Sequence, residues 1–153
     1  MKPIRILVTG IAGGIWLLFI TFLSDYIAVL VAPYNIFDIG GMRPPDDPIM
    51  ALFFLYPFLF AFIAAFVFEL VKGSLRGSRD KKGCIFGGIL ILLVLVPNIL
   101  VIFSSMTYPA GFYISNLLSG IIGYPILGIL FARVMVEKKQ TKNLSASLSM
   151  RVA

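Results

Sequence analysis

The chain has 153 residues and a formal net charge of +6; 59% of its residues are hydrophobic and only 13% are charged. A water-soluble domain of this length could not bury so much apolar surface, since small domains leave a large fraction of their residues exposed. The composition therefore excludes a soluble protein and predicts one domain embedded in lipid. With one cysteine and no histidine, the sequence excludes an internal disulfide, a Cys/His zinc cluster and a histidine-ligated haem. We predict no catalytic, metal or cofactor site.

The first predicted membrane span covers residues 6–31, where Asp25 is the only charge. A hydrocarbon core of about 30 Å needs roughly 20 helical residues, and this run is long enough. Lys2 and Arg5 precede it, as basic residues precede the apolar part of a signal peptide. The run is longer than the roughly 7–15 apolar residues of a signal peptide and has no clear cleavage site, so we expect it to stay as an anchor.

Residues 32–48 form the longest predicted connection, and they lead into the second span, residues 49–71. Four prolines rule out a regular helix in this connection and favour an ordered, extended path. The second span contains Tyr56-Pro57 and carries Glu69 near its end.

The third predicted span, residues 83–106, has no charge, and the fourth, residues 112–136, carries Arg133 near its end. The short turn between them makes these two spans an antiparallel hairpin. All four runs are continuously apolar rather than alternating, which favours helices over a β-barrel. We therefore predict an all-α integral membrane protein with four transmembrane helices in an antiparallel bundle, formed by residues 1–137 and followed by a flexible basic tail, residues 138–153.

The basic residues are distributed unevenly along the chain. Only Arg43 lies in residues 32–48, beside three aspartates, and every other lysine or arginine lies on the opposite side of the predicted spans. Because cytoplasmic segments carry the excess of basic residues, we predict a multi-pass protein of the cell membrane with both termini in the cytoplasm. We expect anionic lipid headgroups at the cytoplasmic face to contact the basic residues there. These residues are Arg76, Arg79, Lys81, Lys82, Lys138, Lys139 and Lys142.

The two halves of the chain share a pattern that predicts an internal duplication. In the second and fourth spans, a tyrosine-proline pair is followed by a glutamate at the same spacing. Two parallel hairpins would then be related by a pseudo-two-fold axis along the membrane normal. Chance is the alternative, because apolar residues often agree. The matching residues are Tyr56-Pro57, Leu59, Ala64 and Glu69 in one half and Tyr124-Pro125, Leu127, Ala132 and Glu137 in the other, preceded by Gly13-Gly14-Ile15 and Gly87-Gly88-Ile89.

Proline occurs inside three of the four predicted spans. A proline removes a backbone donor and kinks its helix, so the bundle could enclose a small cavity. In that interpretation Tyr56, Asn98 and Tyr124 are its polar interior or pore positions. The alternative is that the prolines serve packing alone, since membrane helices tolerate them.

Glu69 and Arg133 lie near the same end of two spans that run in the same direction. We predict that they form an ion pair at the inner boundary rather than part of an ion pathway, because long side chains near a helix end reach water. Cys84 lies close to the same boundary. It is either an acylation site or, as we favour, a buried inert thiol.

Small residues recur four positions apart in every span, and such ridges allow helices to approach closely. They predict packing within the chain for the most part, with packing between chains as the alternative. The ridges are Gly10 with Gly14, Ala61 with Ala65, Gly83 with Gly87, and Ser115 with Ser119 and Gly123.

These features favour a small membrane protein without a catalytic site: an accessory or scaffold subunit, or a self-associating helical bundle. The alternative is a small oligomeric channel or transporter for an ion or small solute. A membrane transferase that uses Arg133, Asp25 and tyrosines is a third hypothesis, which we do not favour. The expected partners are the lipid bilayer and a second copy or a larger membrane complex. Nucleic acid is not expected, because the basic residues lie in short segments between apolar runs.

Overall fold

The computed structural model describes residues 3–136 of the chain. Four helical segments in this range are long and apolar enough to cross a membrane: Ile4–Val31, Pro48–Val71, Arg79–Ser105 and Ala110–Met135. No strand occurs among the described residues. The prediction of an all-α protein with four membrane-spanning helices in a bundle is confirmed. The predicted tail, residues 138–153, lies outside the described residues.

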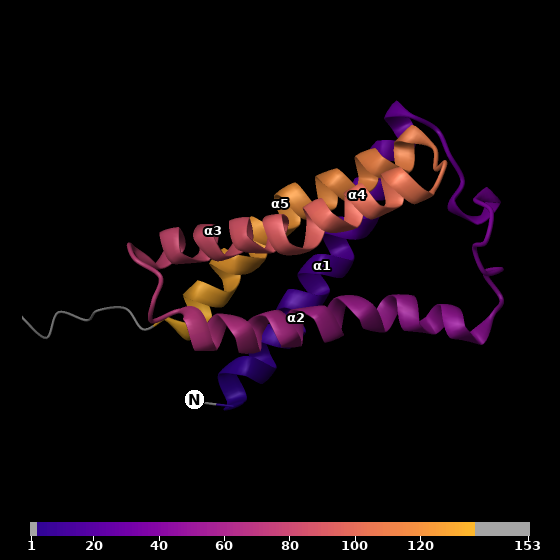
Figure 1. Cartoon of the computed structure of the whole chain (residues 1–153). Helices are drawn as coiled ribbons and strands as arrows, with labels where there is room; N and C mark the ends of the chain where they lie inside the picture. The colour runs from indigo at the N-terminus through magenta and orange to yellow at the C-terminus, as the bar shows by residue number, and fades with distance from the viewer. Residues whose placement is uncertain (1–2, 137–153) are drawn as a thin grey trace, which may run out of the picture.

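Five α-helices make up these segments (Figure 1). The first two spans are α1, Pro3–Val31, and α2, Ala51–Val71, which a short 3-10 helix, Pro48–Met50, precedes. The third span divides into α3, Arg79–Leu90, a π-helical segment, Ile91–Leu95, and α4, Val96–Ser105. The fourth span is α5, Ala110–Met135.

The π-helical segment explains how the third span accommodates its proline. The ring of Pro97 would clash with the carbonyl group one turn earlier in a regular α-helix. A π turn widens the backbone at this point, and the amide of Val96 donates to the carbonyl oxygen of Ile91. The span therefore continues through Pro97 instead of breaking, and Asn98 follows the widened turn.

Local side-chain caps shape the connection between α1 and α2. The side chain of Asn35 accepts a hydrogen bond from the amide of Phe37 at 3.2 Å, and that of Asp47 accepts one from Ile49 at 2.9 Å. Gly41 has a φ of 86°, a conformation that favours glycine. The connection contains a 3-10 helix, Ile36–Asp38, and turns, so it is extended only in part, and it runs alongside the ends of the helices (Figure 1).

The helices pack in the order α2, α1, α5, α3, so that α1 lies between α2 and α5. The third span packs on α5 and meets α2 only near one end, where the rings of Phe68 and Phe86 lie 5.1 Å apart. From this contact α2 and α4 diverge toward the connection between α1 and α2 (Figure 1). A two-fold arrangement would give α2 and α3 the close contact that α1 has with α5. The predicted pseudo-two-fold packing is therefore not observed. The duplication of sequence stays a prediction, and its Glu137 lies outside the described residues.

Tight packing is concentrated where α3 crosses α5. A Cβ atom added to Gly128 would lie 2.1 Å from the carbonyl oxygen of Gly83, so the two backbones touch. On the other side of α1, Gly10 and Gly14 lie under the rings of Phe62 and Phe58. The small-residue ridges are thus used for packing within the chain, which is how close helix contacts are made in lipid.

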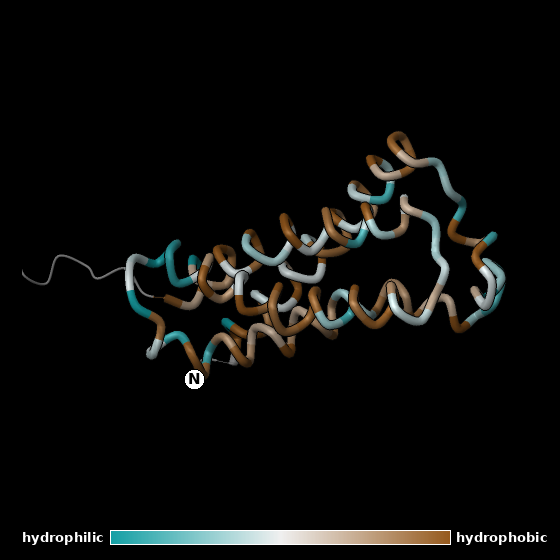
Figure 2. The backbone as a smooth tube through the Cα atoms, turned by 45° about the horizontal axis from the view of Figure 1, so that its top comes forward, coloured by the Kyte–Doolittle hydropathy of each residue, from teal (hydrophilic) through white to brown (hydrophobic). Residues whose placement is uncertain are grey.

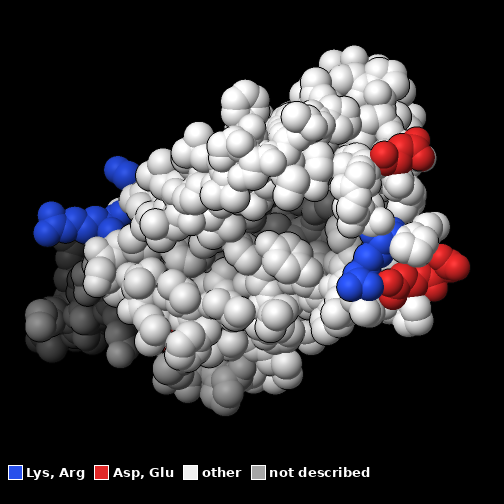
Figure 3. All heavy atoms as spheres, turned by 45° about the vertical axis from the view of Figure 1, so that its right-hand side comes forward, with Lys and Arg blue, Asp and Glu red and all other residues white. Residues whose placement is uncertain are grey.

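Hydrophilic residues gather at the two ends of the molecule (Figure 2), and charge distinguishes these ends (Figure 3). We call the end that holds the start of α1, the connection between α2 and α3 and the end of α5 the basic end. The opposite end, which holds the connection between α1 and α2, is the loop end. The described charges at the basic end are Arg5, Lys72, Arg76, Arg79, Lys81, Lys82 and Arg133 with the acidic Glu69 and Asp80, and the connection at the loop end carries Asp38, Arg43, Asp46 and Asp47.

Candidate binding cavity

The divergence of α2 and α4 leaves a cavity in the half of the bundle nearer the loop end. Two chambers make it up, and they share Thr21, Phe53, Tyr56, Asn98, Asn116 and Ser119 in their walls. The deep chamber has a volume of about 340 Å³ and takes side chains from all four spans. The mouth chamber has a volume of about 730 Å³ and is also lined by the connection between α1 and α2. In the space-filling view this face of the molecule is hollowed beside the charged loop end (Figure 3).

The deep chamber is closed toward the basic end by an aromatic pair. The rings of Phe60 and Tyr124 are stacked with their centroids 5.5 Å apart. Beyond this pair the neighbouring side chains, Ala61, Ala64 and Leu127, are buried. The cavity therefore opens in one half of the bundle and does not cross it.

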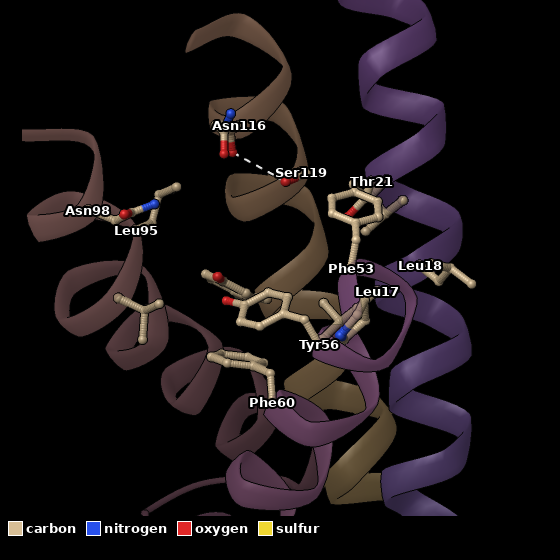
Figure 4. A pocket seen from close by; sticks show the side chains of 14 residues that line it. Leu17, Leu18, Thr21, Phe53, Tyr56, Phe60, Leu95, Asn98, Asn116 and Ser119 are labelled. Atoms are coloured by element: carbon tan, nitrogen blue, oxygen red, sulfur yellow. Dashed lines mark hydrogen bonds between the residues drawn. The ribbon is translucent and has the colours of Figure 1, made fainter. Parts of the chain in front are cut away.

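The three polar positions predicted from the sequence line this chamber together. Tyr56 comes from α2, Asn98 from α4 and Tyr124 from α5. Tyr56 and Asn98 point into the space between α2 and α4 (Figure 4). Tyr56 is 58% exposed because no helix covers it on the α4 side, whereas Tyr124 is half-buried.

Three further polar residues of the cavity were not predicted as site residues. Thr21 comes from α1, and Asn116 and Ser119 come from α5 (Figure 4). Asn116 donates to the carbonyl oxygen of Phe112 at 2.8 Å, and Ser119 donates to that of Asn116 at 3.3 Å. An asparagine within an apolar span is a signal that could have identified Asn116, because amides are costly in lipid.

The mouth chamber contains a pair that joins α1 to the connection after it. The hydroxyl of Tyr34 donates a hydrogen bond to the carboxylate of Asp25. Burial, together with this carboxylate, raises the pKa of Tyr34 to about 12. The phenol is therefore neutral at pH 7 and keeps its proton for Asp25, so the start of the connection is held against the end of α1.

The predicted ion pair between Glu69 and Arg133 is replaced by two other pairs. Lys72 Nζ lies 2.6 Å from Glu69 Oε2 and also donates to the carbonyl oxygen of Met135 at 3.2 Å. Arg133 pairs with Asp80, with Nε and Oδ1 3.1 Å apart. Lys72 lies one turn after Glu69 on the same helix, while Arg133 faces α3, and these positions correct the prediction.

The prediction that Cys84 is a buried thiol is wrong, because its side chain is exposed. The reason is the packing order: α3 buries its Gly83 and Gly87 side against α5, and no helix covers the other side. In the described part of the chain no three Cys, Asp or Glu residues gather as possible metal ligands.

Comparison with protein-family models, with curated proteins and with solved structures finds no match to this chain. The candidate function therefore rests on the geometry and chemistry of the cavity.

Proposed function

We propose that this protein is a multi-pass membrane protein that acts by binding a small amphipathic molecule in the cavity between α2 and α4, without catalysis. One observation carries the proposal: polar side chains from all four spans converge on a cavity whose remaining wall is aromatic and aliphatic. Ligand sites in proteins have this composition, with an apolar lining and a few placed polar groups. Ligand binding without catalysis is compatible with the role of an accessory subunit in a larger membrane complex.

The cavity lies where the close glycine contacts found elsewhere in the chain are absent. In lipid no hydrophobic force closes a gap between helices, so a gap remains where small residues are missing from the facing surfaces. Here the facing surfaces of α2 and α4 carry Phe53, Tyr56 and Asn98. These side chains are large or polar, and they give the wall of the space between the helices its aromatic and amide groups.

Self-association receives less support than ligand binding. The small-residue ridges that suggested it are occupied inside the chain: Gly10 and Gly14 by α2, Gly83 and Gly87 by α5. A homo-oligomer would have to use other surfaces.

Transport of the same ligand is the second candidate function. The observation that favours it is a cavity that is open at one end and closed at the other by the stacked rings of Phe60 and Tyr124. Prolines in α2 and α5 and the π-helical segment before α4 flank this closure. Transport requires that the ring pair separate, and uptake of the retained ligand into proteoliposomes tests it.

The binding proposal is tested by filling the cavity. Ser119→Phe places a ring in the deep chamber, and Ser104→Phe places the same ring on an exposed position of α4 outside it. Native mass spectrometry of protein released from mild detergent measures the molecules each variant retains. We expect a retained small molecule or lipid in the wild type and in Ser104→Phe, and its loss in Ser119→Phe. Equal retention in all three would contradict the proposal.

We further propose that the basic end faces the cytoplasm, where it contacts anionic lipid, and that the cavity opens toward the outer face of the cell membrane. The distribution of lysine and arginine supports this orientation. Single cysteines in a Cys84→Ser background test it with an impermeant thiol reagent on intact cells. Asp46→Cys should be labelled and Ser74→Cys protected; the reverse pattern would overturn the orientation.

Lipid contact is tested separately. Near a charged surface each basic residue contributes up to ~1 kcal/mol. Retained lipids should be enriched in anionic species, and replacing Arg76, Lys81 and Lys82 by glutamine should remove the enrichment. Equal retention of zwitterionic and anionic lipid by the wild type would remove this claim.

A further inference from the structure

The mouth chamber has a charge pattern that narrows the class of ligand. Asp25 carries the only charge among the residues that line it. Among the described residues no lysine or arginine forms an ion pair with Asp25, and the neighbouring Arg43 is paired with Asp47 at 2.7 Å. The chamber therefore presents one carboxylate that no basic residue in the range 3–136 pairs with.

Tyr34 orients this carboxylate without neutralising it. Its hydroxyl donates to one oxygen of Asp25, and the phenol stays neutral at pH 7. Tyr34 contacts only one of the two oxygens of Asp25, and the residue lines the chamber, where a charge interacts more strongly than it does in water.

Aromatic rings form much of the remaining wall. Rings near a carboxylate attract cations that are large, apolar and weakly hydrated, because the face of each ring is electron-rich. A Ca²⁺ site instead takes about six to eight oxygen ligands, usually with several carboxylates, and the described residues hold no cluster of three acidic side chains. The rings are those of Phe22, Phe37, Phe53, Phe54, Tyr56 and Phe112.

The residues around the mouth chamber are also mainly negatively charged. The connection that covers it carries Asp38, Asp46 and Asp47 against a single Arg43. A mouth lined by one sign of charge raises the local concentration of ligands of the opposite sign.

We propose that the mouth chamber binds an organic cation with an apolar body, such as a quaternary ammonium or phosphonium group, with its charge at Asp25 and its body among the rings. This inference rests on the proposed function and names the ligand class. The cation is either a dissolved molecule or the ammonium of a lipid headgroup, since both present the same chemistry.

Three probes of related shape test the charge requirement: tetraphenylphosphonium, a cation; tetraphenylborate, its anionic counterpart; and triphenylphosphine oxide, which is neutral. Equilibrium dialysis against purified protein in detergent, with empty micelles subtracted, measures their binding. We expect tetraphenylphosphonium to bind and tetraphenylborate not to bind above background. Asp25→Asn should weaken binding of the cation at least tenfold, while Asp25→Glu and the exposed control Asp46→Asn should bind it within about twofold of the wild type.

The outcomes separate the two proposals. Equal binding of the cation and the neutral probe, unchanged in Asp25→Asn, overturns the cation inference and leaves the binding cavity standing. Binding of no probe above the level of the cavity-filled Ser119→Phe overturns both. The melting temperature of each variant, measured in the same detergent, shows that it is folded. Repeating the dialysis in nanodiscs of phosphatidylglycerol with and without phosphatidylcholine identifies the source: displacement by phosphatidylcholine assigns the cation to a lipid headgroup, and retention assigns it to a dissolved molecule.

Discussion

The two halves of this bundle are built from the same kinds of residue and pack in opposite ways. In the half near the basic end, α3 and α5 touch through glycine backbones, and the rings of Phe68, Phe86 and Phe131 form a closed cluster. In the half near the loop end, α2 and α4 separate and leave a cavity. Both halves are strongly apolar, so hydrophobicity does not explain the difference.

The difference lies in which residues face one another. Lipid is as apolar as a protein core, so helices associate in it through close van der Waals contact rather than hydrophobic burial. Glycines at 83, 87 and 128 allow that contact, whereas α2 and α4 face one another with aromatic residues and Asn98 across a cavity. Stability should therefore depend on the basic-end half, and binding on the loop-end half.

The largest expected effect comes from opening the contact between α3 and α5. In Gly128→Leu the new side chain meets the backbone of Gly83, which cannot move aside as a side chain could. We expect a loss of ~3 kcal/mol or more, at the upper end for overpacking. Unfolding by SDS in mixed micelles measures it. Gly88→Leu is the matched control, because nothing lies within 4 Å of a Cβ atom at Gly88; a similar loss there would argue against the glycine contact.

A smaller effect is expected from removing a buried ring. Phe131 is fully buried, so Phe131→Ala leaves a cavity. Such substitutions cost about 3–5 kcal/mol in soluble proteins, and we expect about 2 kcal/mol here because lipid replaces water as the solvent. Phe53→Ala in the cavity wall, where Phe53 is 43% exposed, should cost under ~1 kcal/mol. Equal losses in the same SDS titration would erase the contrast between the halves.

Polar contacts near the basic end should also contribute more to the free energy of unfolding than those at the loop end, but less than the packing contacts do. Lys72 joins Glu69 to the end of α5, and it is partly buried. We expect Lys72→Met to cost ~1 kcal/mol, less than the roughly 1.5–3 kcal/mol of a hydrogen bond to a charged group, because water reaches part of this side chain. Arg43→Met breaks an exposed pair at the loop end and should leave the unfolding midpoint unchanged. A larger loss at Arg43 than at Lys72 would contradict this order.

The smallest expected effect concerns the pH dependence of the loop end. The folded-state pKa of Tyr34 is about 12, above the ordinary value of 10.0. Its stabilising contribution is therefore complete below pH 10 and is lost as the pH rises through about 12. The difference in melting temperature between the wild type and Tyr34→Phe should be constant below pH 10 and shrink above it. A difference that stays constant to pH 12 would show that the hydrogen bond to Asp25 does not form.

The sequence predicted the spans closely, because long uncharged runs have few alternatives to membrane helices. It also predicted that Tyr56, Asn98 and Tyr124 share one interior region, since each lies beside a proline at mid-span. The depth of a residue in the membrane follows from its residue number along the span, so the sequence alone is enough to place these three residues at a similar depth.

The sequence could not predict which helices pack against one another. The spans are apolar on all sides, so no periodic pattern marks the face that turns inward. For this reason the two-fold packing and the pair of Glu69 with Arg133 were predicted wrongly, although both residues lie at the expected depth. The contact of Asp25 with Tyr34 depends on the path of the connection, which its prolines restrict but do not determine.

The central claim is that the bundle has an open cavity in its loop-end half and a closed core in its basic-end half. The accessibility of single cysteines to a thiol reagent tests this claim most directly. In a Cys84→Ser background, Ser119→Cys lies in the cavity wall and Ala132→Cys in the closed half. A water-soluble, membrane-impermeant thiol reagent is applied to the folded protein in nanodiscs, and the labelled fraction is measured by mass spectrometry. We expect rapid labelling at position 119, slowed by tetraphenylphosphonium, and no labelling at position 132 until SDS unfolds the protein. Equal protection at both positions in the folded state would contradict the account.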